Sequence, residues 1–208
     1  MNKPPIFITG IGTDIGKTVT SAVLVEKLKA DYWKPVQSGD LDNSDTMKVK
    51  ALISNTQSKF HPEAYRLTQP YSPHKSAALD GIEIKLENIV LPETDNQLII
   101  EGAGGLFVPL NNNDFIIDLI QKLNAEVVLV VKHYLGSINH TLLSIEMLKQ
   151  RNLNLRCIIF NGEKDDYSED IIMQHFSSSN YTHIPFNNEI TKNFVLEQAN
   201  QIDDRVFD

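Results

Sequence analysis

The segment from Gly10 to Thr18 constrains this chain more than any other, because glycines connect a strand-like run directly to a helix-like stretch. The run Ile6–Thr9 is apolar or β-branched, and Lys17 opens a stretch with helical periodicity. Glycines let a short connection turn tightly, so that several backbone N–H groups face one anion beside the positive end of the helix dipole. The order of strand, loop and helix therefore predicts a phosphate-binding loop.

The loop departs from the usual spacing, because five residues rather than four separate Gly10 from Gly16. We therefore expect a loop that is one residue longer than usual. Lys17 can supply a cation for the β- and γ-phosphates of ATP, and the Thr18 hydroxyl is placed to bind Mg²⁺. The alternative is a glycine-rich turn with an accidental Gly-Lys-Thr. The residues expected to bind the nucleotide are Gly12, Thr13, Asp14, Ile15, Gly16, Lys17, Thr18 and Val19.

Strand-like and helix-like segments alternate along the rest of the chain, which predicts an α/β fold. Several strand candidates are apolar without alternation, as is typical of parallel strands that are buried on both faces. We expect one P-loop NTPase-like domain over residues 1–208, with a mostly parallel central sheet and helices on both faces. Residues 60–90 are expected to form a long irregular excursion on the ligand side. The predicted strands are Ile6–Thr9, Tyr32–Val36, Leu98–Glu101, Glu126–Val131, Arg156–Phe160 and Thr182–Phe186, and the predicted helices are Lys17–Ala30, 44–53, Asp114–Leu123, 138–151, 166–176 and 189–200.

Composition excludes several classes of partner. The net charge is −8 and the 19 Lys and Arg residues are scattered, which argues against a nucleic-acid partner. The longest apolar runs, such as Val127–Val131, have the length of strands, so no membrane span is expected. The first residues lack the pattern of a secretory signal, and Cys157 is the only cysteine, which fits a reducing compartment. We therefore expect a cytoplasmic protein.

Polar residues follow the other predicted strands, at the edge where an open parallel sheet binds ligands. Lys34 lies in an apolar strand before Pro35, which favours a functional lysine. Glu101 ends a strongly apolar run at the position where P-loop enzymes usually place an acidic group beside Mg²⁺; the alternative is an acid that complements a helix dipole. Asp45 is a second candidate metal ligand, although Asp40 and Asp42 remain rivals.

Other chemistries find little support in the sequence. The histidines show no metal-ligand spacing, and surface or hydrogen-bonded core histidines are expected instead. No Gly-x-Ser-x-Gly segment is present, so acyl transfer by a serine is not supported.

Taken together, several motifs resemble the dethiobiotin synthetase family. The resemblance runs from residue 6 to about residue 162, and the combination of the phosphate loop with the Lys34 and Glu101 segments carries its specificity. Asp14 stands where this family usually carries Glu. The motifs are the phosphate loop, Lys34-Pro35-Val36-Gln37-Ser38-Gly39, Asn43-Ser44-Asp45, Ser72-Pro73-His74, Glu101-Gly102-Ala103-Gly104-Gly105-Leu106-Phe107-Val108-Pro109-Leu110 and Leu135-Gly136-Ser137-Ile138-Asn139-His140.

The resemblance implies a ligase that joins CO₂ to 7,8-diaminopelargonate with ATP and Mg²⁺, giving dethiobiotin, ADP and phosphate in biotin biosynthesis. It implies that Lys17 and Lys34 neutralise charge on the carbamate and on the transferring phosphoryl group. It also implies a homodimer in which the partner subunit receives the substrate carboxylate. The remaining roles implied are Thr13 and Ser38 at the carbamate and amine site, Thr18, Asp45 and Glu101 as Mg²⁺ ligands, Asn161 at the adenine edge, and Gly136, Ser137 and Asn139 as the carboxylate receiver.

Two other functions agree less well with the sequence. A corrinoid-amidating ligase of the same branch would need a glutaminase domain, and 208 residues are too few to contain one. An ATPase switch of the partition or septum-positioning type usually carries a second lysine early in the loop, where this chain has Gly10, Ile11 and Gly12. Such switches often add an amphipathic membrane tail, whereas residues 203–208 are largely acidic.

Overall fold

A seven-stranded parallel sheet with the strand order β4-β2-β6-β1-β7-β8-β9 forms the centre of the computed structural model, which describes residues 3–176 and 180–207. A separate pair, β3 and β5, is also parallel. The predicted parallel sheet is therefore confirmed. The strands are β1 (Ile6–Gly10), β2 (Asp31–Trp33), β3 (Val36–Ser38), β4 (Phe60–His61), β5 (Tyr65–Leu67), β6 (Leu98–Gly105), β7 (Glu126–Val131), β8 (Leu155–Gly162) and β9 (Tyr181–Pro185).

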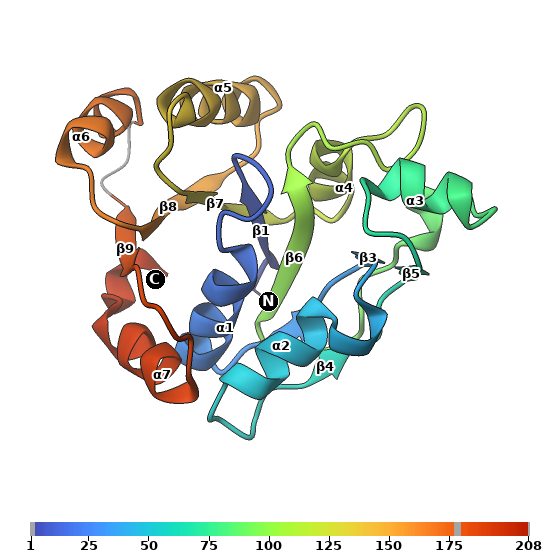
Figure 1. Cartoon of the computed structure of the whole chain (residues 1–208), viewed down its shortest axis with the longest axis horizontal. Helices are drawn as coiled ribbons and strands as arrows, with labels where there is room; N and C mark the ends of the chain where they lie inside the picture. The colour runs from blue at the N-terminus through green and yellow to red at the C-terminus, as the bar shows by residue number, and fades with distance from the viewer. Residues whose placement is uncertain (1–2, 177–179, 208) are drawn as a thin grey trace.

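Helices cover both faces of the main sheet, as the sequence predicts (Figure 1). Buried residues of α1, α2 and α7 share one apolar core, and those of α3, α4, α5 and α6 pack on the opposite face. The α-helices are α1 (Lys17–Leu28), α2 (Asp45–Leu52), α3 (Pro73–Leu79), α4 (Ile116–Lys122), α5 (Ser137–Gln150), α6 (Asp166–His175) and α7 (Lys192–Gln201), and the 3₁₀ turns are η1 (Leu41–Asn43), η2 (Leu86–Asn88) and η3 (Asp204–Val206).

The strands lack polar alternation because each face of the sheet is buried. On β1, Ile6 and Ile8 pack toward α1 while Phe7 packs into the core on the other side. All three side chains are at most 2% exposed. Burying a side chain of this size stabilises a fold by about 1.5–3 kcal/mol, so both faces favour apolar residues.

The prediction of one strand over Tyr32–Val36 is wrong. The strand β2 ends at Trp33, and β3 begins at Val36 in the small second sheet. Pro35 lies between them and has no N–H to donate, so it cannot continue a strand with neighbours on both sides. Its carbonyl instead accepts a hydrogen bond from Tyr65 N at 3.0 Å. The break turns the chain toward the ligand edge.

The irregular excursion predicted for residues 60–90 is also partly wrong. It contains β4, which extends the main sheet, as well as β5 and α3. Strands of two and three residues are too short to show a period, so no residue pattern could indicate them. Residues 70–73 nevertheless border the largest cavity at the ligand edge, as the prediction of a ligand-side excursion requires.

Smaller differences occur at element ends. The helix α1 ends at Leu28 rather than Ala30, because Lys29 adopts a left-handed conformation with φ of 51°. The last strand lies one residue earlier than expected, at Tyr181–Pro185. Across the described ranges, no helix combines the length and the apolar character that a membrane crossing requires.

Candidate active site

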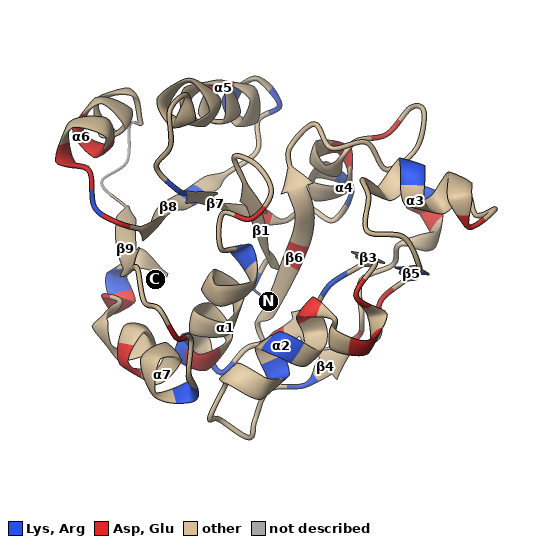
Figure 2. Cartoon of the chain, in the orientation of Figure 1, with Lys and Arg blue, Asp and Glu red and all other residues tan. Residues whose placement is uncertain are grey.

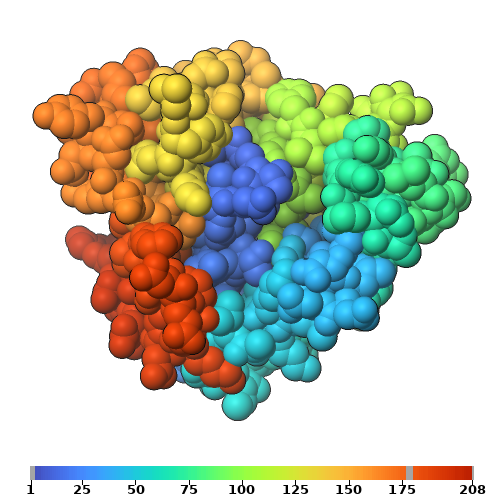
Figure 3. All heavy atoms as spheres, in the orientation of Figure 1, coloured from blue at the N-terminus to red at the C-terminus, as the bar shows by residue number. Residues whose placement is uncertain are grey.

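A cavity of about 850 Å³ opens where β1 and β6 end and where the chain leaves β2. Because lysine and carboxylate side chains line it, we call it the charged cavity. In Figure 3 the N-terminal segment, in blue, is visible at the centre of this face between the segments coloured cyan, green, yellow and red. The predicted site residues that line the cavity are Thr13, Asp14, Gly16, Lys17, Thr18, Val19, Lys34, Ser38, Asp45 and Glu101.

The phosphate loop joins β1 to α1 in a conformation that needs glycine at its last position. Gly16 has φ of 95°, and a Cβ there would lie 2.0 Å from the Asn161 side-chain nitrogen. Asn161, on β8, donates from Nδ2 to the Ile15 carbonyl at 2.9 Å. The Ile15 side chain is buried in the core beneath. Asn161 therefore contacts the loop directly, and it does not line the charged cavity.

Lys17 lies at the start of α1 and is 8% exposed. Its Nζ donates to the Gly12 carbonyl at 2.9 Å, so the side chain folds back across the loop. Burial lowers the pKa of the Lys17 ammonium to about 8, against a partial opposing effect of the Glu101 carboxylate. An ammonium that is poorly hydrated and beside the loop is suited to bind a phosphate anion.

Glu101, on β6, is the centre of a buried hydrogen-bond network. Its side chain is 1% exposed, and both carboxylate oxygens accept hydrogen bonds from groups on two other elements and one connection. Several donors thus replace the water that this carboxylate loses on burial. The donors are Thr18 Oγ1 at 2.9 Å and Lys34 Nζ at 3.1 Å to Oε1, and Ser21 Oγ at 2.8 Å and Tyr32 OH at 2.9 Å to Oε2.

Lys34 lies between two carboxylates. Its Nζ is 2.8 Å from Asp45 Oδ2 and 3.1 Å from Glu101 Oε1. Burial alone lowers the pKa of the Lys34 ammonium, but the two carboxylates outweigh burial and raise that pKa above its ordinary value. Burial likewise raises the pKa of the Asp45 carboxyl, and Lys34 outweighs it, so the net shift is downward. The pair is therefore held in its charged form.

The oxygen groups at this edge fit a magnesium ion. Thr18 and Glu101 are in contact, and Asp45 meets Glu101 through the shared Lys34. Mg²⁺ typically takes one or two carboxylates and completes its shell with phosphate oxygens and water. Within residues 3–176 and 180–207, no group of three His, Cys, Asp or Glu side chains could hold a metal ion. The donor set therefore suits a metal that is bound together with nucleotide phosphates.

The wall of the cavity near β3 carries Ser38. Its Oγ is buried, and no hydrogen-bond partner lies within reach among the described residues. A buried hydroxyl without a partner is uncommon in native proteins, so its position in a ligand cavity points to a polar ligand group. Thr13 is exposed at the mouth of the same cavity.

A second cavity, of about 580 Å³, lies on the other side of the loop and is lined mainly by apolar residues. Gly12 and Thr13 form its boundary with the phosphate loop, and Tyr134 lies there with its OH 2.7 Å from His140 Nδ1. Two apolar side chains that line it are strongly exposed, Phe107 at 50% and Leu143 at 61%, and so is Leu135, the residue after Tyr134, at 104%.

The predicted carboxylate receiver lies at the start of α5, outside both cavities. Gly136 is the helix N-cap, with φ of 105°, and no side chain caps the helix. Ser137 is buried, whereas Gly136 and Asn139 are exposed. None of the predicted receiver residues lines the charged cavity of its own chain.

Sequence reasoning missed several groups around Glu101. Ser21 follows Thr18 by one helical turn, and Tyr32 precedes Lys34 by two residues in extended chain, so each shares a face with a predicted residue. The helical spacing from Thr18 to Ser21 and the two-residue spacing from Tyr32 to Lys34 were the sequence signals that could have indicated these groups. Lys48 lines the cavity next to Asp45 and was also missed, as were Pro70 and Tyr71, whereas Ser72 and Pro73 belong to a motif that the sequence analysis names.

Comparisons with known proteins relate the sequence of this chain to others. A family model described as an AAA domain matches residues 5–193. The ATP-dependent dethiobiotin synthetase BioD of Christiangramia forsetii is 57% identical over 166 residues, covering 80% of this chain and 80% of that protein. The protein of the same name from Cytophaga hutchinsonii is 48% identical over 203 residues, covering 97% of this chain and 98% of that protein.

Solved structures with the same fold are more distant in sequence. The ParA family ATPase from Chlorobium tepidum TLS has a TM-score of 0.56 and 11% identity, covering 96% of this chain and 100% of that chain. At this identity the likeness shows the fold alone.

Proposed function

This chain belongs to the ATP-dependent dethiobiotin synthetase family, and we propose on that premise that its charged cavity performs the ring-closing carboxylation of 7,8-diaminopelargonate. The protein is an ATP-dependent ligase of biotin biosynthesis. The observation that carries the assignment of the site is the convergence of Lys17, Lys34 and the Glu101 network in one cavity.

The reaction needs positioned charge more than a covalent nucleophile. One substrate amine attacks CO₂ and loses a proton, which gives a carbamate. A carbamate oxygen then attacks the γ-phosphorus of ATP and ADP leaves, so that a mixed anhydride of carbamate and phosphate forms. The second amine attacks the carbamate carbon, phosphate departs, and the cyclic urea closes.

The residues of the cavity have distinct proposed roles in these steps. Lys17 contacts the γ-phosphoryl group as it transfers, and Lys34 offsets the negative charge of the carbamate. Thr13 and Ser38 orient the carbamate and the amines. Because Lys34 is held by Glu101 and Asp45, its ammonium is positioned before substrate binds, which reduces the reorganisation required during the reaction.

Thr18, Asp45 and Glu101 would hold Mg²⁺, whose charge neutralises the β- and γ-phosphate oxygens. The nucleotide phosphates would be bound by the loop from Gly12 to Val19, with Asn161 on the adenine side of the loop.

We infer that the protein acts as a homodimer with a shared substrate site. The exposed side chains of Phe107 and Leu143 line the apolar cavity, Leu135 follows the lining residue Tyr134, and all three would be covered by a second copy. A closed two-fold pair is the commonest assembly of soluble proteins. In such a pair, Gly136, Ser137 and Asn139 of one copy would lie beside the charged cavity of the other copy. The N-terminus of α5 would there bind the substrate carboxylate.

The alternative of a partition or septum-positioning switch has weaker support. The likeness to a ParA family ATPase concerns the fold only. The loop lacks the second lysine near its start, and Ser38 and Lys34 have no evident use in a switch that only binds and hydrolyses ATP.

The proposed function is tested by the dependence of ATP turnover on the other substrates. Purified protein with ATP, Mg²⁺ and ¹⁴C-bicarbonate should release ADP only when diaminopelargonate is also present. The label should appear in an acid-stable product, because a cyclic urea survives acid whereas free carbamates lose CO₂. ATP turnover that ignores diaminopelargonate would contradict the proposal.

A further inference from the structure

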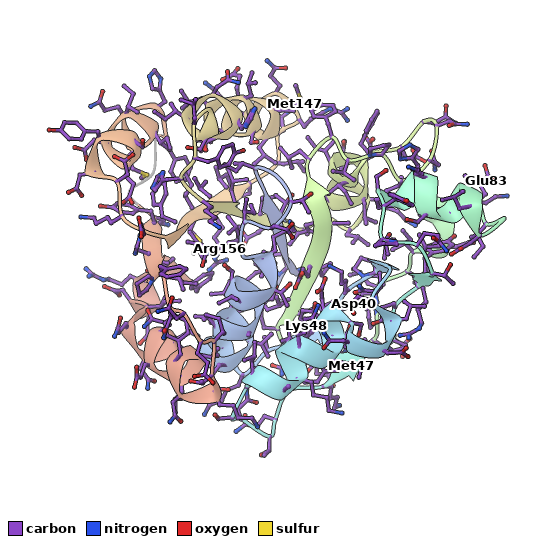
Figure 4. All side chains as sticks on the ribbon, in the orientation of Figure 1. Asp40, Met47, Lys48, Glu83, Met147 and Arg156 are labelled. Carbon is purple, nitrogen blue, oxygen red and sulfur yellow. The ribbon has the colours of Figure 1, made fainter. Side chains whose placement is uncertain are left out.

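Lys48 lies on α2, one helical turn after Asp45, and faces the charged cavity. Its Nζ is 2.7 Å from Asp40 Oδ2 and 3.6 Å from Asp45 Oδ1. Figure 4 shows Asp40 and Lys48 close together at α2, and Figure 2 shows residues of both charge signs on this helix. Lys48 is thus a third lysine at the cavity, and none of the proposed catalytic steps uses it.

The two lysines beside Asp45 differ in how easily each can move away from the Asp45 carboxylate. The Lys34 side chain is 6% exposed and also binds Glu101. The Lys48 side chain is 36% exposed, and its other partner, Asp40, is 53% exposed at the cavity rim. Lys48 can therefore move from Asp45 to Asp40 without leaving a buried charge unpaired, whereas Lys34 cannot.

The backbone before α2 fixes Asp40 in this position. Gly39 and Asp40 both have left-handed conformations, with φ of 68° and 52°. A Cβ on Gly39 would lie 2.7 Å from Pro70, so the turn is packed closely against the segment on the opposite side of the cavity. Asp40 is thereby held within reach of Lys48 rather than of Lys34.

We propose that Lys48 sets the magnesium affinity of the site, because it competes with the metal for Asp45 while Asp40 serves as its alternative partner. The proposal relies on the function proposed above, in which Asp45 is a metal ligand. Lys48 is a positioning residue here, since it acts through Asp45 and contacts no reacting atom. A lysine charge 3.6 Å from an oxygen of a metal ligand repels a divalent cation and attracts that oxygen away from the metal, while the hydrogen bond to Asp40 limits this effect.

The test measures metal binding directly, by electron paramagnetic resonance of Mn²⁺ in the presence of a non-hydrolysable ATP analogue. Lys48→Met should bind Mn²⁺ about fivefold more tightly than the parent, the scale expected for a half-exposed ion pair beside a divalent cation. Lys48→Gln repeats the test with a polar side chain, and Lys48→Arg, which keeps the charge, should stay near the parent. Lys50→Met removes a charge from the exposed side of the same helix and is the matched control.

Asp40→Asn separates an indirect role from a direct one. If Asp40 only draws Lys48 away from Asp45, Asp40→Asn should weaken Mn²⁺ binding about threefold in the parent and leave it nearly unchanged in Lys48→Met. An equal loss in both backgrounds would make Asp40 itself a metal ligand and would overturn the proposal.

Two further outcomes separate this proposal from the function on which it relies. If Lys48→Met and Lys48→Gln match Lys50→Met while Glu101→Gln abolishes Mn²⁺ binding, the metal site stands and the role of Lys48 is overturned. If the parent protein shows no Mn²⁺ binding that depends on Glu101, the metal assignment fails and the proposal fails with it.

Discussion

Two regions of the ligand edge differ in where their side chains find partners. Around Glu101, the buried charges have partners within the chain, as the contacts of Lys34 with Asp45 and Glu101 illustrate. Around the connection from β7 to α5, apolar side chains such as Leu135 project into solvent beside an apolar cavity. The first region is complete in one chain, whereas the second is suited to burial by another chain. Changes in the first should therefore reduce turnover or stability, and changes in the second should affect one substrate and the assembly.

The largest expected effect is that of Lys17→Ala on turnover. The variant loses a charge contact that is stronger when the phosphoryl group transfers, which corresponds to about 3 kcal/mol or more than a hundredfold. The measurement is steady-state turnover at saturating ATP and diaminopelargonate. Lys27→Ala is the control, because Lys27 lies on the same helix and pairs with Asp204 at 2.6 Å. Near-normal turnover of Lys17→Ala would contradict the assignment of the phosphate loop.

Glu101→Gln should reduce stability and metal affinity together. The amide keeps the size of the side chain but turns an NH₂ group toward donors and leaves Lys34 with one carboxylate, which costs about 3 kcal/mol of unfolding free energy. Urea unfolding can be followed by the fluorescence of Trp33, the only tryptophan. The Mg²⁺ concentration needed for half-maximal turnover should also rise.

Glu83→Gln is the control for Glu101→Gln, because the Glu83 side chain is 72% exposed. A Mg²⁺ titration that overlays the parent would remove Glu101 from the metal site, and parent-like unfolding would show that its buried network adds little stability. That outcome would remove the contrast between the two regions.

Asn139→Ala tests the apolar region. Loss of a hydrogen bond to the substrate carboxylate should raise the KM for diaminopelargonate about tenfold and leave the KM for ATP nearly unchanged. A mixture of a Lys17→Ala chain with an Asn139→Asp chain should regain part of the activity, because one composite site in each mixed dimer would be intact. A protein that sediments as a monomer at working concentration and is fully active would contradict a shared site.

The smallest expected effect is that of Ser38→Ala. Its buried Oγ has no hydrogen-bond partner among the described residues, so its removal should leave the unfolding free energy within about 1 kcal/mol of the parent. The KM for diaminopelargonate should rise about fivefold if the hydroxyl binds the substrate. Thr9→Val is the matched control, because Thr9 Oγ1 is likewise buried without a partner in the described ranges but does not line the charged cavity. Equal KM values in both variants would remove Ser38 from the substrate site.

Local sequence determined the frame of the site. The phosphate loop was predictable because glycines, a lysine and a hydroxyl stand in a fixed order between a strand and a helix. Glu101 was predictable as a site residue because it ends the apolar run Leu98–Ile100, although the strand itself continues to Gly105. The parallel sheet and the helices on both faces were predictable as well, since apolar runs without alternation indicate strands that are buried on both sides.

Tertiary structure decided which side chains meet. The sequence left Asp40, Asp42 and Asp45 as rivals, and the folded chain brings Asp45 to Lys34 at 2.8 Å while Asp40 faces Lys48 at the rim. Tyr32 contacts Glu101 although 69 positions separate them. Such contacts depend on which strands pair and in which register, and no local period encodes a pairing between distant segments. The sequence thus determined the elements and their apolar faces, whereas the partners of each charge were set by the long-range packing of β2, β6 and α2.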